Sequence, residues 1–165
     1  MLASSDNPNI ARPKILIVIA HPSIGAALET VLGLEDRYEV RRVPRLADGI
    51  ALVRDWPADV GLIDGVLLAG MGAAGVKTAL GIPTLVLSGT REQGESLATL
   101  LDDGRGWLPK DVAPDALVKA IDTVVGVIRV EADVAGTVGL LVAVIMAVAV
   151  AGAVLFVIYR LAFPV

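Results

Sequence analysis

Three polar side chains in the first two thirds of the chain could act together: a carboxylate, a hydroxyl and an ammonium. Asp64 ends the apolar run "ADVGLID", Ser88 ends "PTLVLS", and Lys110 follows Trp107 in "GRGWLPKD". If these runs are parallel strands, their carboxyl ends meet at one edge of a sheet, where α/β proteins collect functional groups. We therefore expect the three side chains to face one crevice. A carboxylate and an ammonium there can also form a purely structural ion pair, without any turnover.

The segments that must position these side chains alternate between strand and helix. Continuous apolar runs, rather than alternating ones, are typical of parallel strands that helices cover on both faces. Five strand–helix units in one domain predict an α/β fold, a flavodoxin-like, doubly wound, five-stranded parallel sheet. In the stretch 70–81 a glycine-rich loop leads into a short helix, and Pro114 stands near the start of the final helix. The predicted strands cover residues 14–20, 38–44, 58–66, 83–90 and 104–111, and the predicted helices cover residues 23–34, 46–56, 70–81, 92–104 and 113–130.

The order and spacing of these segments resemble the receiver domain of two-component response regulators, over residues 14–128. The run "ADVGLIDG" resembles the strand with the phospho-accepting aspartate, which maps to Asp64, and "TLVLSG" resembles the strand that ends in the switch residue, Ser88. The run "GRGWLPKDVAPDALVKAI" resembles the segment with the family's lysine, Lys110, and places Trp107 at the aromatic switch position. "ILIVIAHPSIGAALETVL" resembles the opening of receivers that usually precede a helix-turn-helix domain. The resemblance implies a role in signal transduction.

One departure from the family concerns the end of the first strand. The family has a pair of acids there that hold magnesium, whereas this chain has Ile19 and Ala20. Phosphoryl transfer depends on neutralising charge on the phosphoryl oxygens, and the metal does much of that. Asp64 alone is a poor site for a hard cation, and the imidazole of His21 is a mediocre magnesium ligand. We expect phosphorylation of Asp64 to be slow or absent, and we expect no metal or cofactor.

A second departure is an apolar segment that stands where the family often has a DNA-binding output domain. No charged residue occurs in the stretch 134–159, and a helix of that length extends roughly 39 Å, enough to cross the hydrocarbon core of a bilayer. Tyr159 and Arg160 stand where an interfacial anchor belongs. The sequence therefore predicts a transmembrane helix over residues 134–160, with a short tail, 161–165.

Small residues recur at every fourth position of this segment and would share one helix face. They predict packing against another membrane protein or a second copy, although alanine is also simply abundant here. The first residues, 1–13, lack the apolar core of a secretory signal and are expected to form a flexible leader. The missing secretory signal and the basic residues on either side of the span weakly favour one orientation. In it, the chain is a single-pass protein of the cell membrane, and its receiver-like domain, 14–130, lies in the cytoplasm. The small residues are Gly139, Ala143, Ala147 and Ala151, and the basic ones are Lys119, Arg129 and Arg160.

Composition excludes several classes of function. The net charge of −4, without clustered Lys and Arg, argues against nucleic acid as a partner. The chain has no cysteine and one histidine, so it has no disulfide, no thiolate metal site and no multi-histidine site within one chain. The run "GMGAAG", residues 70–75, matches the G-x-G-x-x-G dinucleotide pattern, but it lies several residues after Asp64 and follows the third strand rather than the first.

These observations favour a membrane-anchored pseudo-receiver that acts through protein–protein contacts and not as an enzyme. It could recruit a partner in signalling, or serve as an accessory subunit of a membrane complex. The alternative is a receiver that is phosphorylated on Asp64, and a more distant one is a nucleotide-binding enzyme that uses the 70–75 loop. Each marked residue also has a structural explanation: Ser88 can cap the following loop, Trp107 can be a half-buried core residue, and His21 can stand at a helix entrance.

Overall fold

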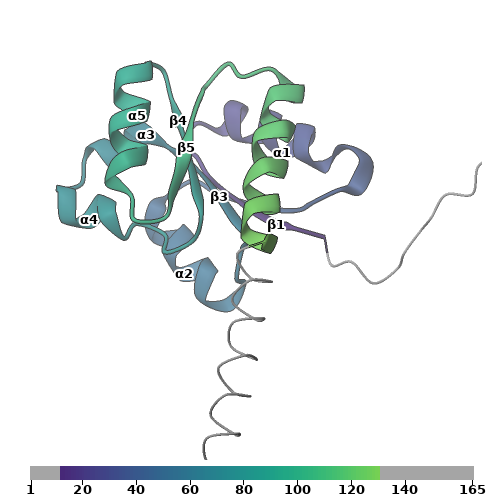
Figure 1. Cartoon of the computed structure of the whole chain (residues 1–165), viewed down its shortest axis with the longest axis horizontal. Helices are drawn as coiled ribbons and strands as arrows, with labels where there is room; N and C mark the ends of the chain where they lie inside the picture. Colours follow the sequence, from purple (N-terminus) through teal and green to yellow (C-terminus); the bar gives the residue numbers. More distant parts are fainter. Residues whose placement is uncertain (1–11, 131–165) are drawn as a thin grey trace, which may run out of the picture. The chain divides into compact units, whose positions relative to one another are not determined.

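The computed structural model describes residues 12–130 of the chain (Figure 1). The chain forms two compact units, Met1–Val125 and Gly126–Val165. The first unit contains the sheet and the candidate site. Of the second, only residues 126–130 are described, as the end of the last helix.

Five parallel strands form one sheet in the order β2-β1-β3-β4-β5. This arrangement confirms the predicted doubly wound parallel sheet. All five residues of β3 and of β4 are buried, as are four of the five in β1, because these strands lie inside the sheet. β2 and β5 form the edges and keep exposed side chains. The strands are β1 (Lys14–Val18), β2 (Glu39–Val43), β3 (Val60–Asp64), β4 (Thr84–Ser88) and β5 (Gly104–Pro109).

Helices cover both faces of the sheet. Figure 1 shows α1 and residues 114–125 of the last helix on one side and the helices between β2 and β5 on the other. Successive strand residues point to opposite faces, so Leu16 and Val18 enter the core cluster that includes Leu97 of α5, and Ile15 and Ile17 enter the other face. The helices are α1 (Pro22–Gly33), the 3-10 turn η1 (Leu34–Asp36), α2 (Leu46–Asp55), α3 (Gly65–Ala69), α4 (Ala73–Lys77), α5 (Arg91–Leu100) and residues 114–130.

The third strand is shorter than the sequence predicts. The predicted strand 58–66 ends at Asp64, and the helix α3 begins at the next residue. The apolar character of the sequence continues past this point, but the carboxylate of Asp64 accepts a hydrogen bond from the amide of Val66 at 3.0 Å. Such a side-chain cap stabilises the first turn of a helix. The short helix expected within 70–81 is α4.

The predictions that concern the two ends of the chain fall outside the described residues. They comprise residues 1–11 of the predicted leader, the transmembrane helix 134–160 with Gly139, Ala143, Ala147 and Ala151, and the tail 161–165. Within residues 12–130, no helix combines the length and the apolar character that crossing a membrane requires.

Candidate functional site

Asp64 and Lys110 meet at the carboxyl edge of the sheet. The Lys110 ammonium lies 2.8 Å from Oδ1 of Asp64, the same oxygen that accepts the Val66 amide. Asp64 is 5% exposed, whereas 28% of the Lys110 side chain remains exposed. The Lys110 backbone amide also donates to the carbonyl of Ser88, at 3.2 Å, which ties the start of the last loop to the end of β4. The structure therefore brings the predicted carboxylate and ammonium into direct contact.

The Ser88 side chain is engaged by the beginning of α5. Its hydroxyl donates to Oε1 of Gln93 and accepts from the Thr90 amide, both at 3.3 Å, and Ser88 is 1% exposed. The backbone of Ser88 contributes to the Asp64–Lys110 edge, while its hydroxyl caps the following segment. This is the local structural role that a serine before a helix can play.

Trp107 is half-buried and packs against the core cluster on the α5 side of the sheet. Its ring lies on Gly94 of α5, so closely that a Cβ atom at Gly94 would be 2.7 Å from two ring carbons. The indole therefore contributes to the packing of α5 on β5. Gly94 was not singled out in the sequence, because a lone glycine in a helical pattern does not identify its neighbour.

Positions 19 and 20, at which receiver domains carry acids, differ in their exposure to solvent in this chain. Ile19 is 1% exposed, and its amide extends the β1–β2 pairing by donating to the carbonyl of Val43 at 3.1 Å. Ala20 and His21 are exposed, and His21 precedes α1 without a side-chain cap to the helix. Within residues 12–130, no three His, Cys, Asp or Glu side chains gather in a way that could hold a metal ion. Asp64 is thus left with a lysine as its charged neighbour.

Two hollows lie along α1, on the side of the sheet that it shares with the last helix. One, of about 380 Å³, extends from Lys110 between Ile24 and Leu28 of α1 and Leu117 of the last helix, and it is mainly apolar. The other, of about 600 Å³, has Tyr38 among its lining residues. Both volumes lie in the range of small-molecule sites, and no pattern in the sequence indicates either hollow.

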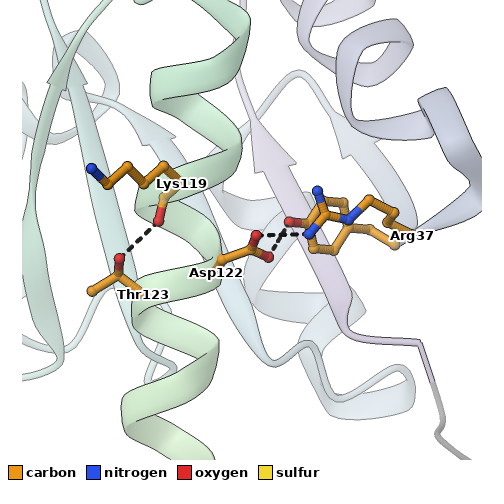
Figure 2. A network of polar contacts seen from close by, with 5 residues as sticks. Arg37, Lys119, Asp122 and Thr123 are labelled. Carbon is orange, nitrogen blue, oxygen red and sulfur yellow. Dashed lines mark hydrogen bonds and ion pairs between the residues drawn. The ribbon is translucent and has the colours of Figure 1, made fainter.

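A polar network lines the larger hollow. Asp122 of the last helix accepts hydrogen bonds from Arg37, at 2.8 Å, and from the phenol of Tyr38, at 2.5 Å. Figure 2 shows Asp122 pointing toward Arg37. Lys119 and Thr123, whose hydroxyl donates to the Lys119 carbonyl, lie on the same helix and also line this hollow. Burial, assisted by the hydrogen bond to Asp122, raises the pKa of Tyr38 to about 12. The network fastens the last helix to the segment before β2.

The run "GMGAAG" lies in a different context from a dinucleotide fingerprint. Gly70 ends α3, Gly72 precedes α4, and Gly75 is inside α4. The fingerprint requires a tight turn from a strand into a helix whose N-terminus meets the pyrophosphate. Here the glycines connect two five-residue helices, which does not favour nucleotide binding.

No protein-family model and no curated protein sequence matches this chain. Solved structures do match it. A CheY-like response regulator receiver domain from Methanospirillum hungatei is 20% identical, with a TM-score of 0.62 over 73% of this chain and 99% of that chain. A receiver domain from Clostridium thermocellum is 17% identical, with a TM-score of 0.61 over 72% and 98%. One from Methylobacillus flagellatus is 19% identical, with a TM-score of 0.57 over 69% and 99%. The sheet and its helices therefore have the fold of response regulator receiver domains.

Proposed function

We propose that this chain is a membrane-tethered, receiver-like signalling module that acts through contacts with other proteins and is not efficiently phosphorylated. The observation that carries the proposal is the edge of the sheet, where Asp64 pairs with Lys110 beside Ile19 and Ala20. The receiver-like fold supports a role in signalling, and the departures from the family at this edge support binding in place of phosphoryl transfer.

The charges at the edge explain why phosphorylation is expected to be inefficient. A phosphoryl group in transfer spreads negative charge over three oxygens, and a divalent cation normally neutralises much of it. Here the negative charge of Asp64 and the positive charge of Lys110 already compensate one another. Ile19 is an apolar side chain buried in the core and supplies no charge. A second carboxylate that could share a cation with Asp64 is missing from positions 19 and 20.

The tether is proposed from the uncharged segment 134–159. A protein held at a membrane meets membrane partners at a raised effective concentration, so that even weak contacts become useful. Two modes fit this arrangement: the domain recruits a soluble partner to the membrane, or the chain is an accessory subunit whose helix packs through its strip of glycine and alanine. The receiver-like part is proposed to be cytoplasmic.

Incubation of the full chain with Mg²⁺ and acetyl phosphate, followed by intact-mass measurement, tests the chemical part of the proposal. We expect no added phosphoryl mass, and the Asp64→Asn variant serves as the matched control. A receiver that retains both acids, treated in parallel, shows that the donor is active. Stoichiometric phosphorylation that disappears in Asp64→Asn would instead establish the alternative function, a phosphorylatable receiver.

Fractionation of cells tests the tether. We expect the full chain to stay with the membrane pellet through a high-salt and an alkaline wash, because a spanning helix resists both treatments. Release by high salt alone would contradict anchoring by a helix. If the chain remains in the pellet, purification in mild detergent and identification of the co-purifying proteins distinguishes recruitment of a soluble partner from membership in a membrane complex.

A further inference from the structure

The smaller hollow along α1 has the size and the lining of a small-molecule pocket. Its volume is about 380 Å³, and ligand sites are typically apolar hollows of roughly 300–1,000 Å³ that contain a few polar groups. Two parts of the chain that lie far apart in the sequence form its walls, α1 and the segment that follows β5. Its apolar lining includes Ile24, Leu28, Val31, Val112 and Leu117.

Two of the lining residues carry polar side chains, Lys110 and Ser23. An ammonium has three N–H donors, and within residues 12–130 the Lys110 ammonium contacts one acceptor, Oδ1 of Asp64, at 2.8 Å. Since 28% of the Lys110 side chain remains exposed, Asp64 does not enclose it. Ser23 is exposed in the first turn of α1. A molecule in the hollow therefore meets a cation that still has donors to offer, and a hydroxyl group.

The charges around Lys110 determine which kind of molecule fits the hollow. Asp64 is only 5% exposed, and Lys110 is the cation that compensates its charge. A carboxylate or phosphate bound to the same ammonium would repel Asp64, because the two anions would share one positive charge. A cationic ligand would meet Lys110 without finding a carboxylate among the described residues that line the hollow. A neutral acceptor, such as a carbonyl oxygen, avoids both repulsions.

We propose that this hollow binds a neutral, mainly apolar small molecule that carries a carbonyl group, such as an ester or a ketone with an alkyl chain. The carbonyl oxygen accepts a hydrogen bond from the Lys110 ammonium, and the alkyl chain lies between Leu28 of α1 and Leu117 of the last helix. Binding is favourable because the alkyl chain leaves water. This goes beyond the proposed function, since it gives a module that does not depend on phosphorylation a chemical signal of its own.

Photolabelling of the full chain tests the site. The probe is the methyl ester of octanoic acid with a photoreactive diazirine at the end of its chain, and mass spectrometry of peptides locates the labelled residues. All samples contain the same mild detergent, so that partition of the probe into micelles is common to them. We expect saturable labelling of α1 and the start of the last helix that an excess of methyl octanoate abolishes. Absence of saturable labelling in these two elements would overturn the proposal.

Two neighbouring alanines of α1 provide a matched pair of variants. Ala26 and Ala27 are both exposed, and of the two only Ala27 lines the hollow. Ala27→Phe is expected to fill the hollow and abolish the saturable labelling, whereas Ala26→Phe is expected to leave it unchanged. Because both positions are on the surface of the helix, both variants are expected to fold. Equal labelling of the two variants would contradict binding in the hollow.

The contact with Lys110 is tested by Lys110→Met, which keeps an apolar side chain and removes the donors. Losing a hydrogen bond to a charged group is expected to weaken saturable labelling by the ester about tenfold or more. The double variant Asp64→Asn/Lys110→Met, in which no carboxylate is left without its cation, is expected to show the same loss. Labelling that is as strong in both variants as in the native chain would contradict the hydrogen bond to the ammonium.

The preference for a neutral ligand is tested with the free acid of the same probe. In the native chain the acid competes with Asp64 for Lys110, and in Asp64→Asn this competition is absent. We expect Asp64→Asn to strengthen labelling by the acid about tenfold relative to labelling by the ester. An equal response of the two probes to Asp64→Asn would overturn the charge argument and, with it, the proposed class of ligand.

The two proposals fail separately. Phosphorylation of Asp64 by acetyl phosphate would contradict the proposed function and leave the ligand site intact. An unphosphorylated chain without saturable labelling in the hollow would contradict the ligand site alone.

Discussion

The ammonium of Lys110 and the amide of Val66 converge on a single oxygen, Oδ1 of Asp64, at 2.8 and 3.0 Å. The first contact joins β3 to the loop after β5, and the second starts α3. One carboxylate therefore holds together two parts of the edge that lie far apart in the sequence. Because Asp64 is nearly buried, its charge depends on Lys110 for compensation.

Replacing Lys110 by methionine is expected to reduce the free energy of unfolding by about 1–3 kcal/mol, since it leaves a buried carboxylate without its cation. The double variant Asp64→Asn/Lys110→Met is expected to be more stable than Lys110→Met alone. Urea unfolding of the full chain measures both. The matched control is Lys77→Met, because Lys77 pairs with Asp102 at 3.6 Å with both side chains more than half exposed, and its loss is expected to cost less than about 1 kcal/mol. Equal losses for both lysines would show that burial of Asp64 does not matter.

Restoring acids at positions 19 and 20 tests what remains of a metal site. Ala20→Asp places a carboxylate on the surface and is expected to change stability little, whereas Ile19→Asp forces a charge into the core and is expected to cost about 3 kcal/mol or more. In the double variant, Mg²⁺ is expected to raise the thermal midpoint, because binding to the folded state alone stabilises it. Thermal unfolding with and without Mg²⁺ makes the measurement. The variant Ile19→Asn/Ala20→Asn is the control, and an equal response to Mg²⁺ in both would contradict a site shared with Asp64.

The strands could be predicted because β1, β3 and β4 are buried on both faces and leave uninterrupted apolar runs. Asp64 and Ser88 were found for the same reason: each is the first polar residue after such a run. The end of the third strand was overestimated, because apolar residues continue past Asp64 and only the hydrogen bond to Val66 reveals the turn into α3.

The contacts between distant elements could not be predicted. Nothing in the sequence relates Tyr38 to Asp122, which meet only because the last helix crosses the segment before β2. The same holds for Gly94 and Trp107, whose contact depends on how closely α5 approaches β5. The apolar runs in the sequence indicate which strands are buried. These contacts depend instead on the distance between the helices and the sheet, which the runs do not indicate.

Tyr38 gives the domain a pH dependence in the alkaline range. Its pKa is raised from 10.0 to about 12, first by burial and then by Asp122, so folding favours the protonated phenol. The resulting stability is fully present below pH 10 and is lost as the pH rises through about 12. We expect the free energy of unfolding to fall over this interval more steeply in the native chain than in Tyr38→Phe. The variant is also expected to cost about 1 kcal/mol near neutral pH. Urea unfolding at a series of pH values compares the two chains, and parallel curves would exclude Tyr38 as the source.

Gly104 offers the most demanding test of the packing of α5 on β5. A methyl group there would meet the carbonyl oxygen of Ala98 at 1.9 Å, a backbone atom that cannot rotate away. Gly104→Ala must therefore separate the helix from the strand, and we expect a loss of at least about 2 kcal/mol in the free energy of unfolding. Gly33→Ala is the matched control, because a Cβ atom there would have no neighbour within 4 Å. As Gly33 ends α1 with an ordinary helical φ of −77°, this substitution is expected to be neutral or to stabilise by up to about 1 kcal/mol. Urea unfolding of the two variants and of the native chain measures the three free energies of unfolding. A Gly104→Ala variant as stable as the native chain would mean that α5 has room to move on β5, and would contradict the close contact between Gly104 and the Ala98 carbonyl.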